Sequence, residues 1–148
     1  MGAESTRSGG DPVKRIATAA AIAAFVLATV LPGTALAHTF VASTSLTIHK
    51  VPVGITNPGA TVIVYGKLRS ARPLCRNNMV VKLMRVRPGA DRLLARDRTD
   101  REGEYIFVRH PRRDQHVYTR FSGFFQTSYG HSHRCGASRS VSIFVNVG

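Results

Sequence analysis

Acidic residues are scarce in this sequence, which has 8 Asp and Glu against 21 Lys and Arg in 148 residues. The few carboxylates fall mostly in or beside predicted turns, so the paired acids of a carboxylate-dependent hydrolase are missing. The G-x-S-x-G turn that presents a nucleophilic serine is absent as well. The hydrophobic fraction of 43% is enough to bury a core, which excludes wholesale disorder. We therefore expect one small folded domain that is not an enzyme.

The first 37 residues have the features of a secretory signal peptide. Lys14 and Arg15 precede an uncharged apolar run at 16–31, which is followed by a helix-breaking Pro-Gly and by small residues up to Ala37. The alternative is a retained membrane anchor, but a bilayer-spanning helix needs roughly 20 apolar residues. We expect a signal helix that is cleaved after Ala37, and a single secreted domain at 38–148 without a transmembrane anchor.

Cleavage would leave the positive charge on a shorter chain. The removed segment holds three basic and two acidic residues, so 18 basic and 6 acidic residues remain in 111, a net charge of +12. Export argues against intracellular nucleic acid as the partner of this charge. Anionic polymers of the cell envelope, or anionic lipid head groups, are the partners expected outside the membrane.

The rest of the chain reads as short alternating strands separated by turn residues. We predict seven strands, at about 45–49, 61–68, 79–86, 92–98, 104–109, 116–122 and 140–147. In the last of them, the apolar residues at 141, 143, 145 and 147 should all face one side. No helical pattern intervenes, which predicts an all-β fold of two antiparallel sheets, with a small barrel as the alternative.

Two cysteines, Cys75 and Cys135, lie in the predicted exported part. In an oxidising compartment a lone pair is most simply a disulfide, which would close a loop of about 60 residues and stabilise the fold by roughly 4 kcal/mol. The competing interpretation is a metal thiolate, because His131 and His133 precede Cys135 at spacings of two.

The segment 99–107 resembles the Thr-Asp-x-x-Gly-x-Tyr-x-Phe hairpin of secreted immunoglobulin-like and carboxypeptidase-regulatory-like (transthyretin-like) sandwiches. Asp100 would bond the turn backbone, and Gly103 would adopt a positive φ. Further similarity to modules exported by Gram-positive bacteria, especially actinobacteria, is found at 62–68, 81–85, 118–123 and 138–141. The resemblance implies a seven-stranded antiparallel sandwich with no shared catalytic residues and no cofactor, used as a stalk, adhesion unit or accessory domain.

Copper binding is a second hypothesis. Cleavage after Ala37 would make His38 the N-terminal residue, whose amine and imidazole can chelate copper together with a further histidine such as His131 or His133. The alternative is a histidine without function at this position, because signal peptidase imposes little on the residue after the cut.

Arginine clusters are the remaining feature, and they suggest an anion-binding surface. We expect Arg92, Arg96 and Arg98 to share one outward face with Leu94. The predicted anion-binding residues are Arg92, Arg96, Arg98, Arg101, Arg112 and Arg113. The alternative is a solvated basic surface without a ligand. The sequence thus predicts a secreted, non-catalytic module that binds anionic polymers, with copper binding or a purely structural envelope role as alternatives.

Overall fold

The computed structural model describes residues 39–128 and 130–148. The predicted signal peptide, its cleavage site and His38 lie outside the described residues. The described part is all-β, which confirms the expected fold class. Its strands are β1 (Thr39–Ala42), β2 (Ser45–Leu46), β3 (His49–Val51), β4 (Ile55–Thr56), β5 (Val62–Arg69), β6 (Val80–Arg85), β7 (Arg92–Arg98), β8 (Glu104–Arg109), β9 (Gln115–Phe121), β10 (Phe124–Ser128), β11 (His131–Cys135), β12 (Ser138–Arg139) and β13 (Ile143–Val147). A short 3-10 turn, η2 (Pro73–Cys75), precedes β6. Within this part of the chain, no helix has the length and apolar character needed to cross a membrane.

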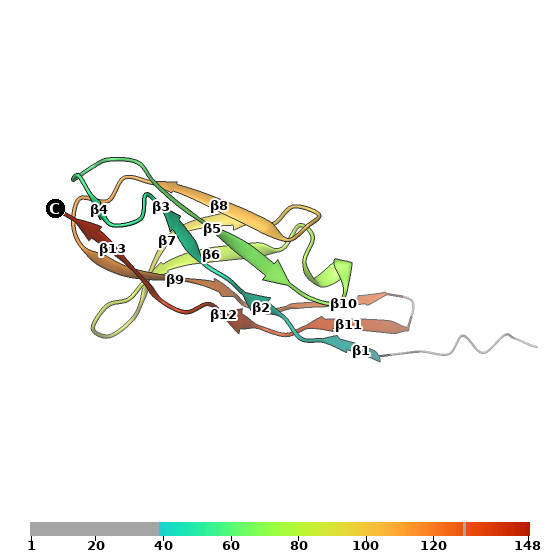
Figure 1. Ribbon diagram of the computed structural model, residues 1–148. Coiled ribbons are helices and arrows are strands. Elements are labelled where there is room, and N and C mark those ends of the chain that lie inside the picture. The colour runs from blue at the N-terminus through green and yellow to red at the C-terminus, as the bar shows by residue number, and fades with distance from the viewer. Residues whose placement is uncertain (1–38, 129) are drawn as a thin grey trace, which may run out of the picture. The chain divides into compact units, whose positions relative to one another are not determined.

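Most of the strands lie in two sheets (Figure 1). One has the order β2-β5-β3, with β8 paired to the other edge of β5. The second has the order β4-β13-β9-β6-β7, and β12 also pairs with β9. All neighbours in these sheets are antiparallel except β4 and β13, which are parallel. A third, smaller sheet has the order β1-β11-β10 and lies at the end of the domain away from the C-terminus (Figure 1).

One buried cluster lies between the two main sheets. The first sheet contributes alternate residues of β5, including Val62, Val64 and Leu68, and the second contributes Val81 and Leu83 of β6. This period of two is what a strand with one buried face requires. The two sheets therefore form two layers around a shared core.

Gly66 on β5 has no side chain, which leaves room for the side chain of a core tyrosine to pass over the strand. It is paired with Tyr105 of β8, whose hydroxyl donates to the Thr47 carbonyl and lies 2.8 Å from the Thr119 hydroxyl. A Cβ at position 66 would overlap both Thr47 O and the Tyr105 ring. Burial raises the pKa of Tyr105 to about 12, which matches a phenol that stays protonated inside the core.

The turn between β7 and β8 has the structure that its sequence predicts. The Asp100 carboxylate accepts hydrogen bonds from the Glu102 and Glu104 amides at 3.0 and 2.8 Å. Gly103 has a φ of +86°, which favours glycine. The aromatic residues that follow, Tyr105 and Phe107, are both buried in the core.

The predicted disulfide is present. Cys75 of η2 and Cys135 of β11 are bonded, with their Cα atoms 5.5 Å apart and both residues buried. The bond attaches the small β1-β11-β10 sheet to the segment that leads into β6. A metal thiolate at Cys135 is thereby excluded in this state.

Each of the seven predicted strand segments contains a strand, but the last was predicted too long. The chain leaves the sheet at 140–142, where the Ser140 hydroxyl is buried and accepts from the Thr119 amide at 2.9 Å. This break turns Val141 outward, where it is 74% exposed, while Val145 is buried. The expectation that the four apolar residues of 140–147 share a face was therefore wrong for Val141.

Candidate anion-binding surface

The six arginines predicted to bind anions lie in three separate places. Arg96 and Arg98 project from β7, and Arg101 lies in the turn between β7 and β8. Arg92 lies at the start of β7, and it lines one groove together with Arg112 and Arg113 of the β8–β9 connection. The sequence therefore predicted a cluster that the fold divides.

A β-bulge on β7 separates Arg92 from its predicted neighbours. Leu83 pairs with Ala95 and Met84 pairs with Leu93, which leaves Leu94 as an extra residue. An extra residue reverses the alternation beyond it. Leu94 accordingly packs against the core instead of facing outward with Arg96. The expectation that Arg92, Leu94, Arg96 and Arg98 share one outward face was wrong for Arg92 and Leu94.

Four basic residues lie directly opposite one another across four strands. Arg96 of β7 pairs with Lys82 of β6, Lys82 pairs with Arg120 of β9, and Arg120 pairs with Arg139 of β12. We call Arg96, Lys82, Arg120 and Arg139 the cationic row. Neighbouring strands are about 4.8 Å apart, so the row extends across the sheet for roughly 14 Å.

The side chains of the cationic row all lie on the outer face of the sheet. The residues next to Lys82 and Arg120 in their strands are buried on the core side: Val81, Leu83, Thr119 and Phe121. Arg96 and Arg139 are paired directly with Lys82 and Arg120, so they lie on the same face. Arg96, Arg120 and Arg139 are exposed, and Lys82 is half-buried. Since successive side chains point to opposite faces, the row faces solvent.

Two neutral contacts support the row. The Lys82 Nζ atom donates to the Ser122 hydroxyl at 3.2 Å. The Arg139 guanidinium lies 3.6 Å from the centre of the Tyr118 ring, in a cation–π contact. Such contacts orient a cation and leave its charge available.

Among the residues that the structure describes, no carboxylate forms an ion pair with the row. Over residues 39–128 and 130–148, the structure has one ion pair, between Lys67 and Glu104, and it lies on the other sheet. The charge of Asp91 interacts with that of Arg139 in the row. The hydrogen bond from Tyr118, followed by that from the Arg87 amide, lowers the pKa of Asp91. Asp91 thus stays ionised beside one end of the row.

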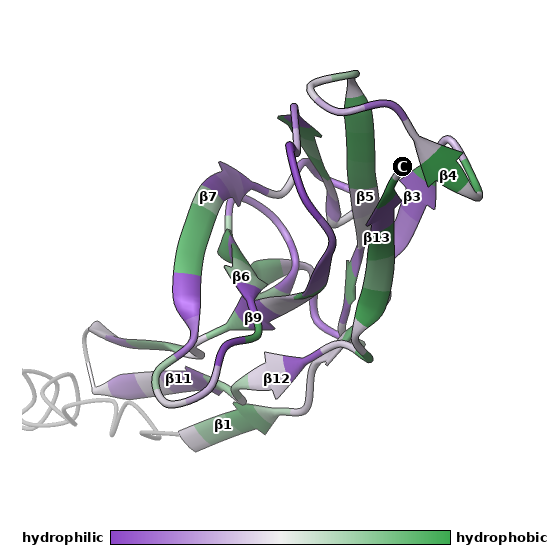
Figure 2. Ribbon diagram, turned by 90° about the vertical axis from the view of Figure 1, so that its left-hand side faces the viewer, coloured by the Kyte–Doolittle hydropathy of each residue, from purple (hydrophilic) through white to green (hydrophobic). Residues whose placement is uncertain are grey.

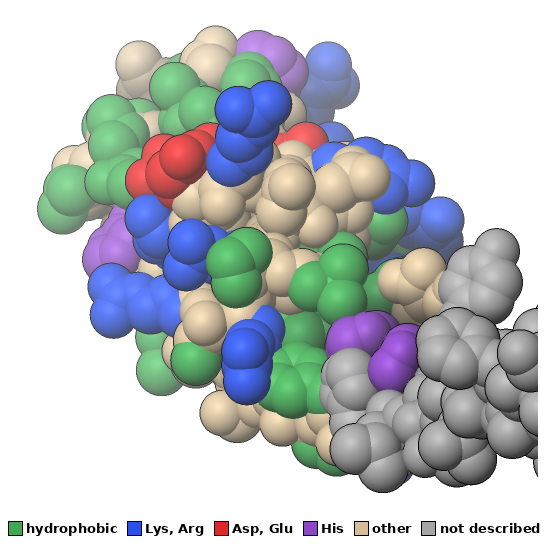
Figure 3. All heavy atoms as spheres, turned by 90° about the vertical axis from the view of Figure 1, so that its right-hand side faces the viewer, with side chains coloured by type: hydrophobic (Ala, Val, Ile, Leu, Met, Phe, Trp, Pro, Cys, Tyr) green, Lys and Arg blue, Asp and Glu red, His purple; other side chains and the backbone are tan. Residues whose placement is uncertain are grey.

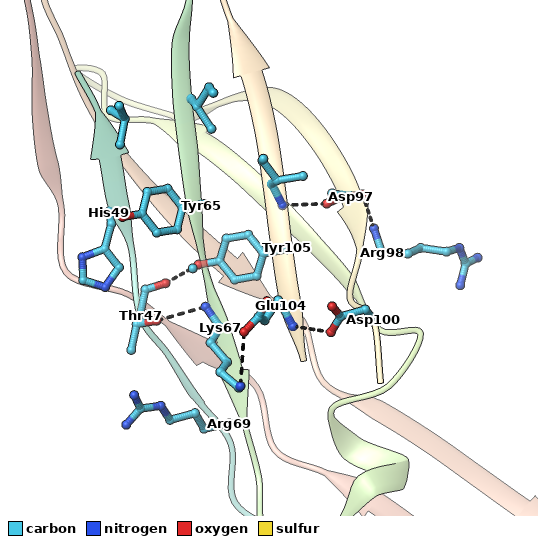
Figure 4. Close-up of a pocket in the computed structure, with 14 residues that line it drawn as sticks. Thr47, His49, Tyr65, Lys67, Arg69, Asp97, Arg98, Asp100, Glu104 and Tyr105 are labelled. Atoms are coloured by element: carbon cyan, nitrogen blue, oxygen red, sulfur yellow. Dashed lines mark hydrogen bonds and ion pairs between the residues drawn. The ribbon is translucent and has the colours of Figure 1, made fainter. Parts of the chain in front are cut away.

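The outer face of the other sheet has a different character. It contains a shallow depression of about 800 Å³ between β3, β5, β8 and the end of β7, lined by Tyr65, Ile106 and the Lys67–Glu104 pair (Figure 4). Asp97 lies at its edge and accepts from the Ile106 amide at 2.8 Å, which satisfies a backbone donor on β8. On this face, Lys67 and Glu104 thus form an ion pair, and the Asp97 carboxylate binds a backbone amide.

At the end of the domain where β10 and β11 lie, basic side chains occur in separate groups among hydrophobic and other side chains (Figure 3). The register of the strands, and not the overall charge, distinguishes the cationic row.

The histidines proposed as metal ligands are only partly placed by the structure. His131 and His133 both lie on β11, two residues apart, and the His133 ring packs against Phe40 at 6.0 Å. In the described part of the chain, no group of three or more His, Cys, Asp or Glu side chains is arranged to hold a metal ion. His38, on which the copper hypothesis depends, lies outside that part.

Comparison with protein-family models and with curated proteins found no match to this chain. The candidate site therefore depends on its geometry alone. Sequence reasoning missed Lys82, Arg120 and Arg139, although Lys82 and Arg120 lie within the strands predicted at 79–86 and 116–122. These residues share one feature, which is a basic side chain at an outward position on each of several neighbouring strands. This feature can be recognised only when the strand pairing is known.

Proposed function

We propose that this protein is an exported, non-catalytic module of the immunoglobulin-like or transthyretin-like type that binds linear anionic polymers of the cell envelope through the cationic row. The observation that carries the proposal is the register that aligns Arg96, Lys82, Arg120 and Arg139. Like charges directly opposite one another destabilise a sheet. A row of four without ion-pair partners among the described residues favours a ligand that supplies the missing negative charge.

The strand order supports the immunoglobulin-like part of this proposal. The order β7-β6-β9-β13 corresponds to the C′-C-F-G order of such sandwiches. In the other sheet, β2 and β3 together correspond to strand A, β5 to strand B and β8 to strand E. The signal-peptide features of residues 1–37 support export. The absence of paired catalytic acids and of a nucleophile motif in the sequence supports a binding role.

A linear polymer fits the row better than a membrane surface does. The four cations form a line, and a chain of phosphodiester or sulfate groups presents charges along a line as well. A lipid bilayer would be contacted by a broad basic patch with apolar side chains that insert beside it. We therefore commit to the polymer and treat anionic vesicles as a test.

The proposal is tested by binding to heparin and to polyphosphate. Binding of the four cations would release counterions from the polymer, so the affinity should depend on salt. We expect it to fall about 50- to 150-fold between 50 and 200 mM salt. The double variant Lys82→Ala/Arg120→Ala should lose most of this binding. The matched control Lys50→Ala/Arg69→Ala removes one Lys and one Arg from the other sheet and should keep it.

Two results would overturn the proposal. One is an equal loss of binding in the row variant and in the control, since it would show that only net charge matters. The other is tighter binding to vesicles of anionic lipid than to either polymer, which would favour a membrane partner.

A further inference from the structure

A second basic site lies at the end of the two layers where β6 and β8 end and β7 and β9 begin. A groove of about 620 Å³ opens there. Of the described residues that line it, five are arginines: Arg85, Arg92, Arg109, Arg112 and Arg113. Figure 2 faces this end and shows the strongly hydrophilic connection from β8 to β9 between β7 and β13.

The fold brings these arginines together from distant parts of the chain. Arg85 and Arg92 are paired across β6 and β7, and the bulge at Leu94 places Arg92 on this side of the sheet. Arg109 is the last residue of β8, and Arg112 and Arg113 follow three and four residues later.

The β8–β9 connection is fixed by the burial of Pro111 and by two hydrogen bonds. Pro111 is buried, and its carbonyl accepts from the Gly59 amide at 2.7 Å. The Asp114 carboxylate accepts from the Val147 amide, also at 2.7 Å. The backbone that carries Arg112 and Arg113 is therefore held in place, as a binding site requires.

The positive charge of the groove is not neutralised by its own lining. None of its described lining residues is Asp or Glu. Both acids nearby in sequence have other partners, since Asp91 bonds Tyr118 and the Arg87 amide, and Asp114 bonds Val147. Desolvation, followed by the charges of Arg113, Arg87 and Arg92, lowers the pKa of Arg85.

We propose that this groove binds the phosphate monoester group of a small polar molecule such as a sugar phosphate. Guanidinium groups bind phosphate oxygens through paired hydrogen bonds, and several can share one phosphate. A cluster of five cations favours a dianion over a monoanion, hence a phosphate monoester over a sulfate monoester. The volume lies within the range of small-molecule sites and leaves room for the group that bears the phosphate.

This site is separate from the cationic row. The row lies on the outer face of the second sheet, whereas the groove opens at the end of the layers, and they have no residue in common. The two sites can therefore be tested independently in the same protein.

Calorimetric titration of the purified protein with glucose 6-phosphate tests the proposal, with inorganic phosphate, glucose 6-sulfate and glucose as comparison probes. We expect saturable binding at one site, tightest for glucose 6-phosphate and undetectable for glucose. The double variant Arg92→Gln/Arg112→Gln changes two exposed residues, so it should fold normally. It should bind glucose 6-phosphate at least about 10-fold more weakly, since it loses two charge-assisted contacts.

Lys82→Gln/Arg120→Gln is the matched control, because it removes the same charge from the cationic row. It should bind glucose 6-phosphate normally and lose heparin retention. The groove variant Arg92→Gln/Arg112→Gln should instead keep heparin retention and bind glucose 6-phosphate weakly. Equal weakening in both variants would overturn the proposal, as would the absence of saturable binding. Affinity for inorganic phosphate or glucose 6-sulfate equal to that for glucose 6-phosphate would also contradict it.

Discussion

The outer faces of the two main sheets follow the same alternating pattern but differ in how their charges are arranged. On the β3-β5-β8 face, Lys67 pairs with Glu104 at 3.4 Å, and exposed apolar side chains such as Ile106 surround the pair. On the β7-β6-β9-β12 face, Lys82 lies between Arg96 and Arg120. Alternation decides which side chains face outward, but register decides which charges meet.

The difference has an energetic meaning. Cross-strand pairs of opposite charge contribute favourably, by about 0.2 to 1 kcal/mol, and directly opposed like charges oppose folding. On the β3-β5-β8 face, which we call the paired face, the Lys67–Glu104 pair therefore contributes favourably to stability, whereas the cationic row opposes folding. This is the pattern expected where a surface is used for binding.

The largest effect on stability should come from Gly66→Ala, which disrupts the sheet of the paired face. Its Cβ would overlap Thr47 O and the Tyr105 side chain, so the free energy of unfolding should fall by about 3 kcal/mol. Chemical denaturation measures this change. Heparin binding by the molecules that remain folded should be unchanged, and a loss of binding there would contradict the independence of the two faces.

Arg120→Glu should separate stability from binding. The new carboxylate would lie opposite both Lys82 and Arg139, so unfolding should become harder by about 0.5 to 1 kcal/mol while polyanion binding weakens. Arg69→Glu, on the other sheet, is the control and should leave binding intact. If Arg120→Glu lowered stability, the row would not be a site of repulsion.

Asp91 gives a smaller, pH-dependent effect at the edge of the row. Hydrogen bonds from Tyr118 and the Arg87 amide lower its pKa below the ordinary value of 3.8. A carboxylate with a lowered folded pKa stabilises the fold above its unfolded pKa, and this contribution is lost as the pH falls through the folded value. Melting temperatures from pH 6 downward should therefore decline below about pH 4 less steeply in Asp91→Asn than in the wild type. Identical pH profiles would rule out this role for Asp91.

The smallest effect is expected from the ion pair of the paired face. Lys67→Ala and Glu104→Ala should each change the free energy of unfolding by no more than about 1 kcal/mol, because the pair is exposed to solvent. Binding to heparin should stay within about 2-fold of the wild type at constant ionic strength. A large loss of binding in Lys67→Ala would show that both faces contribute to recognition.

The strands that bury regular alternate residues were predictable from sequence. Segments such as 62–69 and 104–109 are rich in β-branched and aromatic residues and bury alternate positions, and the turn at Asp100 and Gly103 has a recognisable chemistry. Strands β10 and β11 were missed because most of their residues are polar or only partly buried, and because β11 pairs with β1, which is distant in the sequence.

The candidate sites were less predictable than the strands. The bulge at Leu94 follows from the fit of β7 against β6, and it moved Arg92 from the expected outer face to the groove. The cationic row depends on three separate strand registers, none of which is determined by one segment alone. Arginine content suggests an anionic ligand, but only the fold shows which arginines lie together.

The salt dependence of polyanion binding tests the central claim most directly. The dissociation constant for heparin should be measured between 50 and 400 mM NaCl for the wild type, for single alanine variants at Lys82, Arg96, Arg120 and Arg139, and for Arg69→Ala. The account predicts that the slope of log affinity against log salt decreases in magnitude by about one for each residue removed from the row, and stays unchanged for Arg69→Ala. An equal decrease for Arg69→Ala and for the row variants would contradict it.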